Sequence, residues 1–176
     1  MPTSEATLDR QPAALPLSRA ALARLIALFL PVALLGGALG SQYLAGLVPC
    51  EMCYWQRWPH AAAIVLAALA FIGSAASDRS RALTLLAAAA IGVSGAIGVY
   101  HAGVEHGIFE GLTTCTSTAS GATTAELLDA IMNAPLVRCD QVQFAYLGIS
   151  MAGWNAILSL GGAAAIAWLT LRERTA

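Results

Sequence analysis

Residues 25–47 read LIALFLPVALLGGALGSQYLAGL, a run of 23 residues without a single charged side chain. A helix needs about 20 predominantly apolar residues to cross the hydrocarbon core of a bilayer. The run also exceeds the apolar core of about 7–15 residues that is usual in a cleavable signal peptide. The stretch therefore predicts a signal-anchor helix that stays in the membrane.

Three further apolar runs lie at about residues 58–76, 82–100 and 146–171. Because backbone polar groups in lipid must be paired within the segment, each run is predicted to be a helix. The composition agrees, with 58% hydrophobic residues, 11% charged residues and a mean hydropathy of +0.69, whereas a soluble domain averages about 25% charged residues. The predicted fold class is all-α, an integral membrane four-helix bundle.

The placement of arginines predicts the orientation of this bundle, because basic residues accumulate on the cytoplasmic side. The chain has nine arginines and no lysine. Seven fall on one predicted side and two on the other; the seven are Arg10, Arg19, Arg24, Arg79, Arg81, Arg172 and Arg174, and the two are Arg57 and Arg138. Both termini are therefore predicted to be cytoplasmic. No basic stripe is present, which argues against nucleic-acid binding.

The predicted domain organisation is a single four-helix transmembrane domain between two short tails. The parts are a cytoplasmic tail at 1–23, the domain at 24–171, outward loops at about 48–57 and 101–145, and a second cytoplasmic tail at 172–176.

All four cysteines, Cys50, Cys53, Cys115 and Cys139, fall in the two outward loops, which predicts an oxidising compartment. The Cys50–Cys53 ring is too small to constrain much unfolded-state entropy, whereas the same spacing is common in redox-active dithiols. Zinc would need two more ligands, and a c-type haem would need a histidine where Tyr54 stands. Thiol–disulfide exchange is the strongest interpretation of this pair.

Arg57 follows Cys53 by four residues, a spacing that places both on one face of a helix beginning near Met52. A guanidinium beside a thiol favours the thiolate, and it can donate hydrogen bonds to an acceptor lying in the lipid. The alternative is an interfacial anchor, flanked by Trp55 and Trp58 in an aromatic belt. The spacing alone leaves both interpretations open.

The second outward loop contains a predicted amphipathic helix at 124–134, capped by Thr123 or Thr124 and ended by Pro135. We expect this helix to lie on the membrane surface. Cys139 follows just before the last span. A disulfide on a mobile loop is accessible to another protein's thiol, which suits exchange.

Three motifs, CEMCYWQR at 50–57, YHAGVEH at 100–106 and CDQVQF at 139–144, resemble stretches of the bacterial disulfide-bond formation protein B (DsbB) family. The resemblance covers the chain from about residue 25 to 171. It implies a multi-pass protein of the bacterial inner membrane with a periplasmic active side. The implied activity is that of a thiol:quinone oxidoreductase.

The resemblance also implies a relay through the four cysteines. A periplasmic thioredoxin-like thiol oxidase of the DsbA type would attack a Cys115–Cys139 disulfide, with Cys115 carrying the mixed disulfide. Cys139 would pass the electrons to the Cys50–Cys53 pair. Cys53 would be the thiolate that hands them to a bound quinone.

On the quinone side, the resemblance implies that Arg57 polarises the quinone oxygen. The family's second quinone-side residue is a histidine after the third span, for which His106 is the first candidate and His101 the second. Whether the quinone is ubiquinone or menaquinone stays open.

Other functions are compatible with parts of the sequence. One is a membrane scaffold with two structural disulfides, and another is a cytochrome-b-like carrier with haem between His60 and His101. A third is a relative in the same reaction class, either a vitamin-K-epoxide-reductase-like oxidase, although those relatives place the quinone-side CxxC late in the chain, or a specialised paralogue that serves one dedicated substrate. Asn155, the strongly polar amide of the last span, is expected to be interhelical glue.

Overall fold

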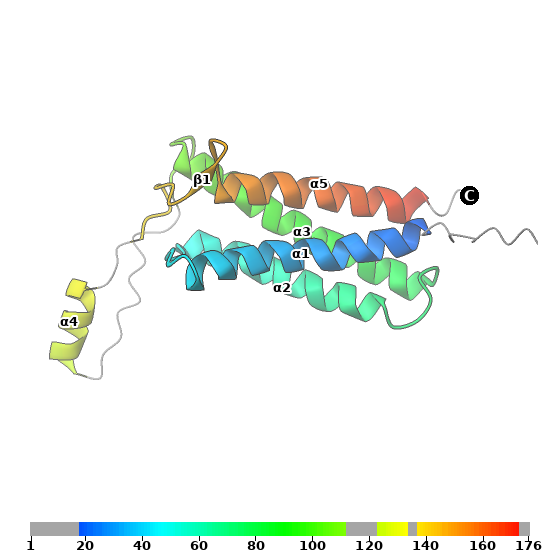
Figure 1. Ribbon diagram of the computed structural model, residues 1–176, viewed down its shortest axis with the longest axis horizontal. Coiled ribbons are helices and arrows are strands. Elements are labelled where there is room, and N and C mark those ends of the chain that lie inside the picture. Colours follow the sequence, from blue (N-terminus) through cyan, green and yellow to red (C-terminus); the bar gives the residue numbers. More distant parts are fainter. Residues whose placement is uncertain (1–17, 112–122, 134–136, 173–176) are drawn as a thin grey trace, which may run out of the picture.

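The computed structural model describes residues 18–111, 123–133 and 137–172 of the 176-residue chain. The described chain is mostly helical, as the sequence predicts. Its elements are α1 (Arg19–Tyr43), α2 (Glu51–Ala70), α3 (Asp78–Glu105), α4 (Thr124–Asn133), β1 (Ala145–Tyr146), β2 (Ile149–Ser150) and α5 (Met151–Arg172). The four long helices α1, α2, α3 and α5 lie side by side and alternate in direction, whereas α4 stands apart from them (Figure 1).

Among the described residues, α1, α3 and α5 are long and apolar enough to cross a membrane. Helix α2 is not one of them, because its first half carries Glu51, Arg57 and His60. That α2 is a fourth span therefore stays a prediction.

The core shared by the four long helices is built mainly from small side chains. Its buried members are Ala23, Ala27, Ala63, Ala67, Ala87, Ala88, Ile91, Ile166 and Leu169. Small residues let helices approach closely where lipid provides no hydrophobic drive to associate. Helices α3 and α5 approach closely at Gly98, where an added Cβ would lie 3.0 Å from the carbonyl oxygen of Ala152.

The helices differ from the predicted spans at their ends. Helix α1 ends at Tyr43, four residues before the predicted end, and Gly46 then takes a positive φ of 69°. Helix α5 begins at Met151, five residues after the predicted start, because Leu147 and Gly148 form the two-residue turn of a β1–β2 hairpin. Both central residues of that turn have positive φ, as a tight hairpin requires. The apolar character of the sequence did not show that α1 ends early or that a hairpin precedes α5.

Helix α4 confirms the predicted cap at Thr123. The Thr123 N–H donates to Glu126 Oε2 at 3.1 Å, and the Glu126 N–H donates to Thr123 Oγ1 at 3.3 Å. This reciprocal pair is a capping box. Pro135, expected to end the helix, lies outside the described residues, and membrane contact of α4 stays a prediction.

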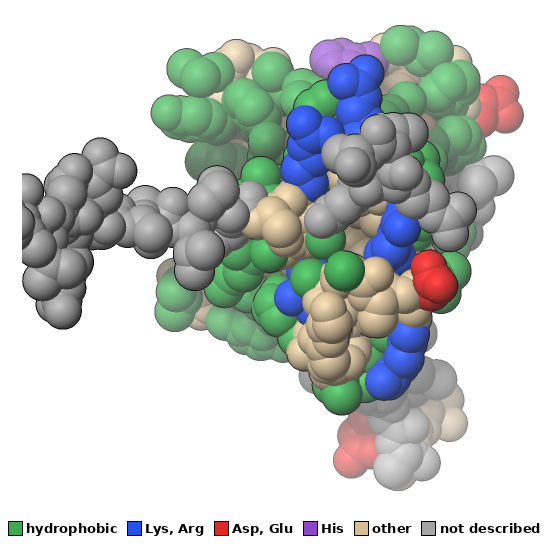
Figure 2. All heavy atoms as spheres, turned by 90° about the vertical axis from the view of Figure 1, so that its right-hand side faces the viewer, with side chains coloured by type: hydrophobic (Ala, Val, Ile, Leu, Met, Phe, Trp, Pro, Cys, Tyr) green, Lys and Arg blue, Asp and Glu red, His purple; other side chains and the backbone are tan. Residues whose placement is uncertain are grey.

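One end of the molecule gathers arginines around the start of α1, the turn from α2 to α3 and the end of α5, as Figure 2 shows. Arg24 donates to the carbonyl of Ala70 at 3.0 Å, and Arg81 donates to that of Thr170 at 3.2 Å. Cations beside the carboxyl ends of helices are stabilised by the helix dipole. This end lies opposite the CxxC motif, an arrangement consistent with the predicted orientation.

We expect Gly98→Ala to lower the midpoint of thermal unfolding in detergent, because its Cβ would press on the α5 backbone. Overpacking costs about 1–3 kcal/mol, and each kcal/mol shifts the midpoint by roughly 2–4 °C in a protein of this size. Gly161→Ala is the matched control, since nothing lies within 4 Å of its added Cβ. Equal melting of both variants would contradict the close α3–α5 approach.

Candidate functional site: a dithiol at the mouth of an apolar cleft

The CxxC motif occupies the N-terminus of α2. Cys50 is the N-cap residue, and its sulfur accepts a hydrogen bond from the Cys53 backbone N–H at 3.4 Å. Both residues are thiols, with the Cys50 S–H directed at the Cys53 sulfur across 3.0 Å. The unpaired N–H groups and the dipole at a helix N-terminus favour negative charge on a sulfur at this place.

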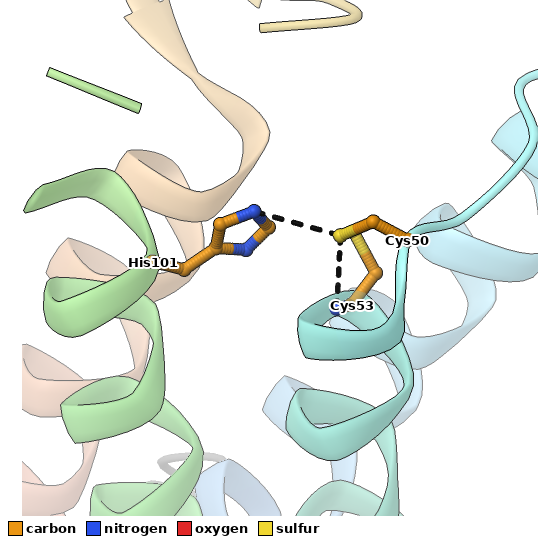
Figure 3. Close-up of side chains that lie close together, drawn as sticks. All are labelled: Cys50, Cys53 and His101. Atoms are coloured by element: carbon orange, nitrogen blue, oxygen red, sulfur yellow. Dashed lines mark hydrogen bonds between the residues drawn. The ribbon is translucent and has the colours of Figure 1, made fainter. Parts of the chain in front are cut away.

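His101 of α3 points at the Cys50 sulfur, with Nε2 3.6 Å from Sγ (Figure 3). Cys139 is buried against Cys50 in a cluster with Met52 and Val104, and its backbone is a hydrogen-bond partner of the His101 ring. The fold therefore brings together three of the four cysteines that the sequence singles out. The fourth, Cys115, lies outside the described residues.

The two cysteines of the motif differ in acidity. The side-chain hydrogen bond from Cys50, helped by a backbone hydrogen bond from Cys50 and by the charge of Arg57, lowers the pKa of Cys53 against the opposing effect of burial. Cys50 is the donor in that bond, and this role, together with burial, raises the pKa of Cys50. Cys53 is therefore the more acidic thiol of the pair, and its role as the thiolate that meets a quinone stays a prediction.

Arg57 lines an apolar cleft of about 530 Å³ together with Cys50 and Cys53. Its guanidinium donates to Gln42 Oε1 at 2.5 Å and to the carbonyl of Ala38 at 3.1 Å, both on α1. In the described part of the chain no carboxylate forms an ion pair with it. A cleft of this size matches a small-molecule site, and the cation has no carboxylate to neutralise it.

The two candidate histidines are separated by the fold. His101 is 3% exposed and lines the cleft, whereas His106 caps the end of α3 through its backbone N–H and does not line the cleft. The structure therefore places His101, the second candidate, next to the dithiol, and which histidine neighbours a quinone stays a prediction. The helix α3 continues to Glu105, so residues 101 and 106 point in different directions.

A buried polar network below the dithiol was not predicted as part of the site. Gln56 of α2 contacts His101 Nδ1 at 2.8 Å, and Asn155 of α5 donates to Gln56 Oε1 at 2.7 Å. Asn155 also donates to the carbonyl of Ser94 on α3 at 3.2 Å, which confirms its predicted interhelical role. The available sequence signal was the occurrence of Asn155 in an otherwise apolar helix and of Gln56 between Trp55 and Arg57.

The haem alternative finds no support in the ring contacts. Nε2 of His60 lies 2.9 Å from both Asn155 Oδ1 and Ser94 Oγ, while His101 contacts Gln56 and Cys50. The Nε2 atoms of both rings are thus committed to protein neighbours. Among the described residues, the potential ligand atoms of Cys50, Cys53 and His101 lie within 4.8 Å of one another. Three ligands are the number that a catalytic zinc site takes from the protein.

Apolar helices with a dithiol at one end of the bundle define a helical membrane protein of the thiol-redox class. The family model for "Disulfide bond formation protein DsbB" matches residues 19–169, and the chain belongs to this family of disulfide-forming membrane oxidoreductases. It is also similar to "Uncharacterized protein RP370" of Rickettsia prowazekii (strain Madrid E), with 24% identity over 139 residues, covering 77% of this chain and 79% of that protein. No solved structure matches.

We expect the pKa of Cys53 in the reduced protein to lie below that of an ordinary thiol. Cys50→Ala should raise this pKa most, because it removes the largest stabilising contact, and Arg57→Met should raise it less. A raised pKa lowers the thiolate fraction at neutral pH, so alkylation by iodoacetamide should slow in both variants. Rates measured against pH, with Cys115 and Cys139 replaced by serine, would test this. An unchanged profile in Cys50→Ala would contradict the assignment.

Proposed function

We propose that this protein is an inner-membrane disulfide oxidase that reoxidises a periplasmic thioredoxin-like thiol oxidase of the DsbA type and passes the electrons to a membrane quinone. The observation that carries the proposal is a dithiol, one member of which has a lowered pKa, at an apolar cleft lined by Arg57, with which no carboxylate of the described residues forms an ion pair. Family membership supports the same reaction class.

The proposed relay begins at a Cys115–Cys139 disulfide, which the reduced partner attacks at Cys115. Cys139 then leaves as a thiolate and attacks the sulfur of Cys50, against which it packs. The Cys50–Cys139 bond forms, the Cys50–Cys53 bond breaks, and the electron pair goes to Cys53. Cys53 is the better leaving group because its pKa is lowered, and a more acidic thiol leaves faster.

The cleft fits a quinone ring by its size, its apolar lining and the Arg57 guanidinium. A quinone bound there supplies the electron sink, taking up two electrons and two protons as the dithiol becomes a disulfide. Arg57 would hold the ring oxygen and stabilise the negative charge that develops on it. Cys53 gives the electron pair, and Cys50 closes the disulfide.

Quinone reduction by purified protein in detergent tests the proposal. A reduced thioredoxin-like thiol oxidase is the donor, and the ultraviolet absorbance of the quinone is followed with ubiquinone and menaquinone analogues. We expect turnover in the wild type and none in Cys50→Ser or Cys53→Ser. No turnover with either analogue, in a folded protein with intact disulfides, would favour a scaffold with structural disulfides instead.

Arg57→Ala should raise the apparent KM for quinone by roughly tenfold to a hundredfold, since a hydrogen bond to a charged group contributes about 1.5–3 kcal/mol. The KM for the thiol partner should change by less than about twofold, because Arg57 lies in the cleft and contacts α1. Arg57→Lys keeps the charge and is the matched control, with part of the affinity restored. Unchanged quinone kinetics in Arg57→Ala would remove the role assigned to this residue.

A further inference from the structure

We propose that Gln56, held in place by Asn155, fixes the protonation of His101 so that Nε2 carries the hydrogen and donates it to the Cys50 sulfur. Gln56 and Asn155 are then positioning residues that act through the histidine. The consequence for catalysis rests on the proposed function, whereas the hydrogen-bond assignment stands on the contacts alone.

The orientation of the Gln56 amide is set by the backbone. One end of this amide lies 3.1 Å from the carbonyl oxygen of Met52, which can only accept a hydrogen bond, so that end must be the NH₂ group. The same nitrogen lies 2.8 Å from Nδ1 of His101. Its second hydrogen is therefore directed at Nδ1, and Nδ1 must be the acceptor.

Asn155 gives an independent check from another helix. Its Nδ2 lies 3.2 Å from the carbonyl oxygen of Ser94, again an obligatory acceptor, so this atom is also a donor. Asn155 Nδ2 lies 2.7 Å from Gln56 Oε1, which accepts. The two backbone carbonyls thus orient both amides consistently, and Gln56 cannot rotate without losing two bonds.

A neutral imidazole carries one hydrogen, so an accepting Nδ1 places it on Nε2. The groups around the rest of the ring suit a donor at Nε2, since the Cys50 sulfur lies 3.6 Å away, Glu105 Oε1 lies 3.9 Å away, and the backbone of Cys139 is a further hydrogen-bond partner of the ring. Each of these groups can accept a hydrogen bond. The 3% exposure of His101 and the 7% exposure of Gln56 keep competing water away from the arrangement.

His101 thereby stabilises negative charge on Cys50 and does not remove its proton. In the proposed relay, the second thiol of the partner attacks the partner's own sulfur in the mixed disulfide, so that the partner leaves as a disulfide and Cys115 is freed as a thiolate. Negative charge then appears on Cys50 when Cys115 attacks Cys139: the Cys115–Cys139 bond forms, the Cys50–Cys139 bond breaks, and the electron pair goes to Cys50. An N–H directed at the departing sulfur speeds this step, because hydrogen bonds to ionised acceptors are the stronger ones.

The same assignment argues against zinc at Cys50, Cys53 and His101. A metal at Nε2 would need that nitrogen bare and the hydrogen on Nδ1, where it would meet the NH₂ group of Gln56. The second sphere of the site is thus built for a protonated Nε2 and not for a metal ligand.

Nitrogen NMR of reduced protein labelled with [¹⁵N]histidine tests the assignment directly, since the chain has only three histidines. His60→Gln and His106→Gln identify the His101 signals by elimination. We expect the Nε2–H form in the wild type. Gln56→Glu can only accept at Nδ1 and should move a hydrogen there, and the uncharged Gln56→Met should give a mixture of both forms. An Nδ1–H form in the wild type, or an unchanged Nε2–H form in both variants, would overturn the proposal.

The catalytic role of Gln56 is tested in a second experiment, which measures quinone turnover. If His101 serves Cys50 as proposed, Gln56→Met should lower turnover about tenfold, and Asn155→Leu should lower it less because Met52 still holds Gln56. Wild-type turnover with an unaffected Gln56→Met variant would overturn the catalytic role alone. Absent turnover in the wild type would count against the proposed function and leave the NMR result standing.

Discussion

The close approach of α3 and α5 at Gly98 is the constraint on which the site depends. A side chain at this position would meet the α5 backbone at Ala152 and the Nδ2 atom of Asn155 at 3.1 Å. With glycine there, Asn155 reaches both the Ser94 carbonyl and Gln56, and Gln56 in turn reaches His101. In an apolar interior each of these polar groups must find a protein partner. The close packing of α3 on α5 and the geometry of the site therefore both require that residue 98 has no side chain.

The helix N-terminus then divides the roles of the two thiols. Cys50, as the N-cap, is buried and donates to Cys53, while Cys53 sits one turn along, facing the cleft and Arg57. The same hydrogen bond lowers the pKa of Cys53 and raises that of Cys50, so one contact makes the pair asymmetric. Cys139 belongs to the same buried cluster as Cys50, the less acidic member, Cys53 packs against that cluster, and both thiols of the motif line the cleft. The proposed relay pairs Cys50 with Cys139 and Cys53 with the ligand of the cleft.

Much of this arrangement could be predicted from the sequence, because its signals are local. The spacing of Cys50, Cys53 and Arg57 needs only one turn of helix, and the Thr123 cap needs only three residues. Other features depend on contacts across helices. The choice of His101 over His106 follows from the α3 face that meets α2, and the role of Gln56 follows from a histidine 45 positions away. The hairpin before α5 was hidden because its residues are as apolar as the helix that follows.

The distribution of arginines shows why Arg57 differs from the rest. At the opposite end, Arg24 and Arg81 bind backbone carbonyls at helix ends, where the dipole supplies negative charge. Arg57 also binds a backbone carbonyl in the C-terminal part of a helix, that of Ala38 on α1, but unlike those two arginines it lines the cleft beside the dithiol. Its guanidinium is held by neutral oxygens of α1 beside an apolar cleft. Among the described residues no carboxylate forms an ion pair with Arg57, and the proposed quinone, which develops negative charge in the cleft, would give this cation a role beyond helix packing.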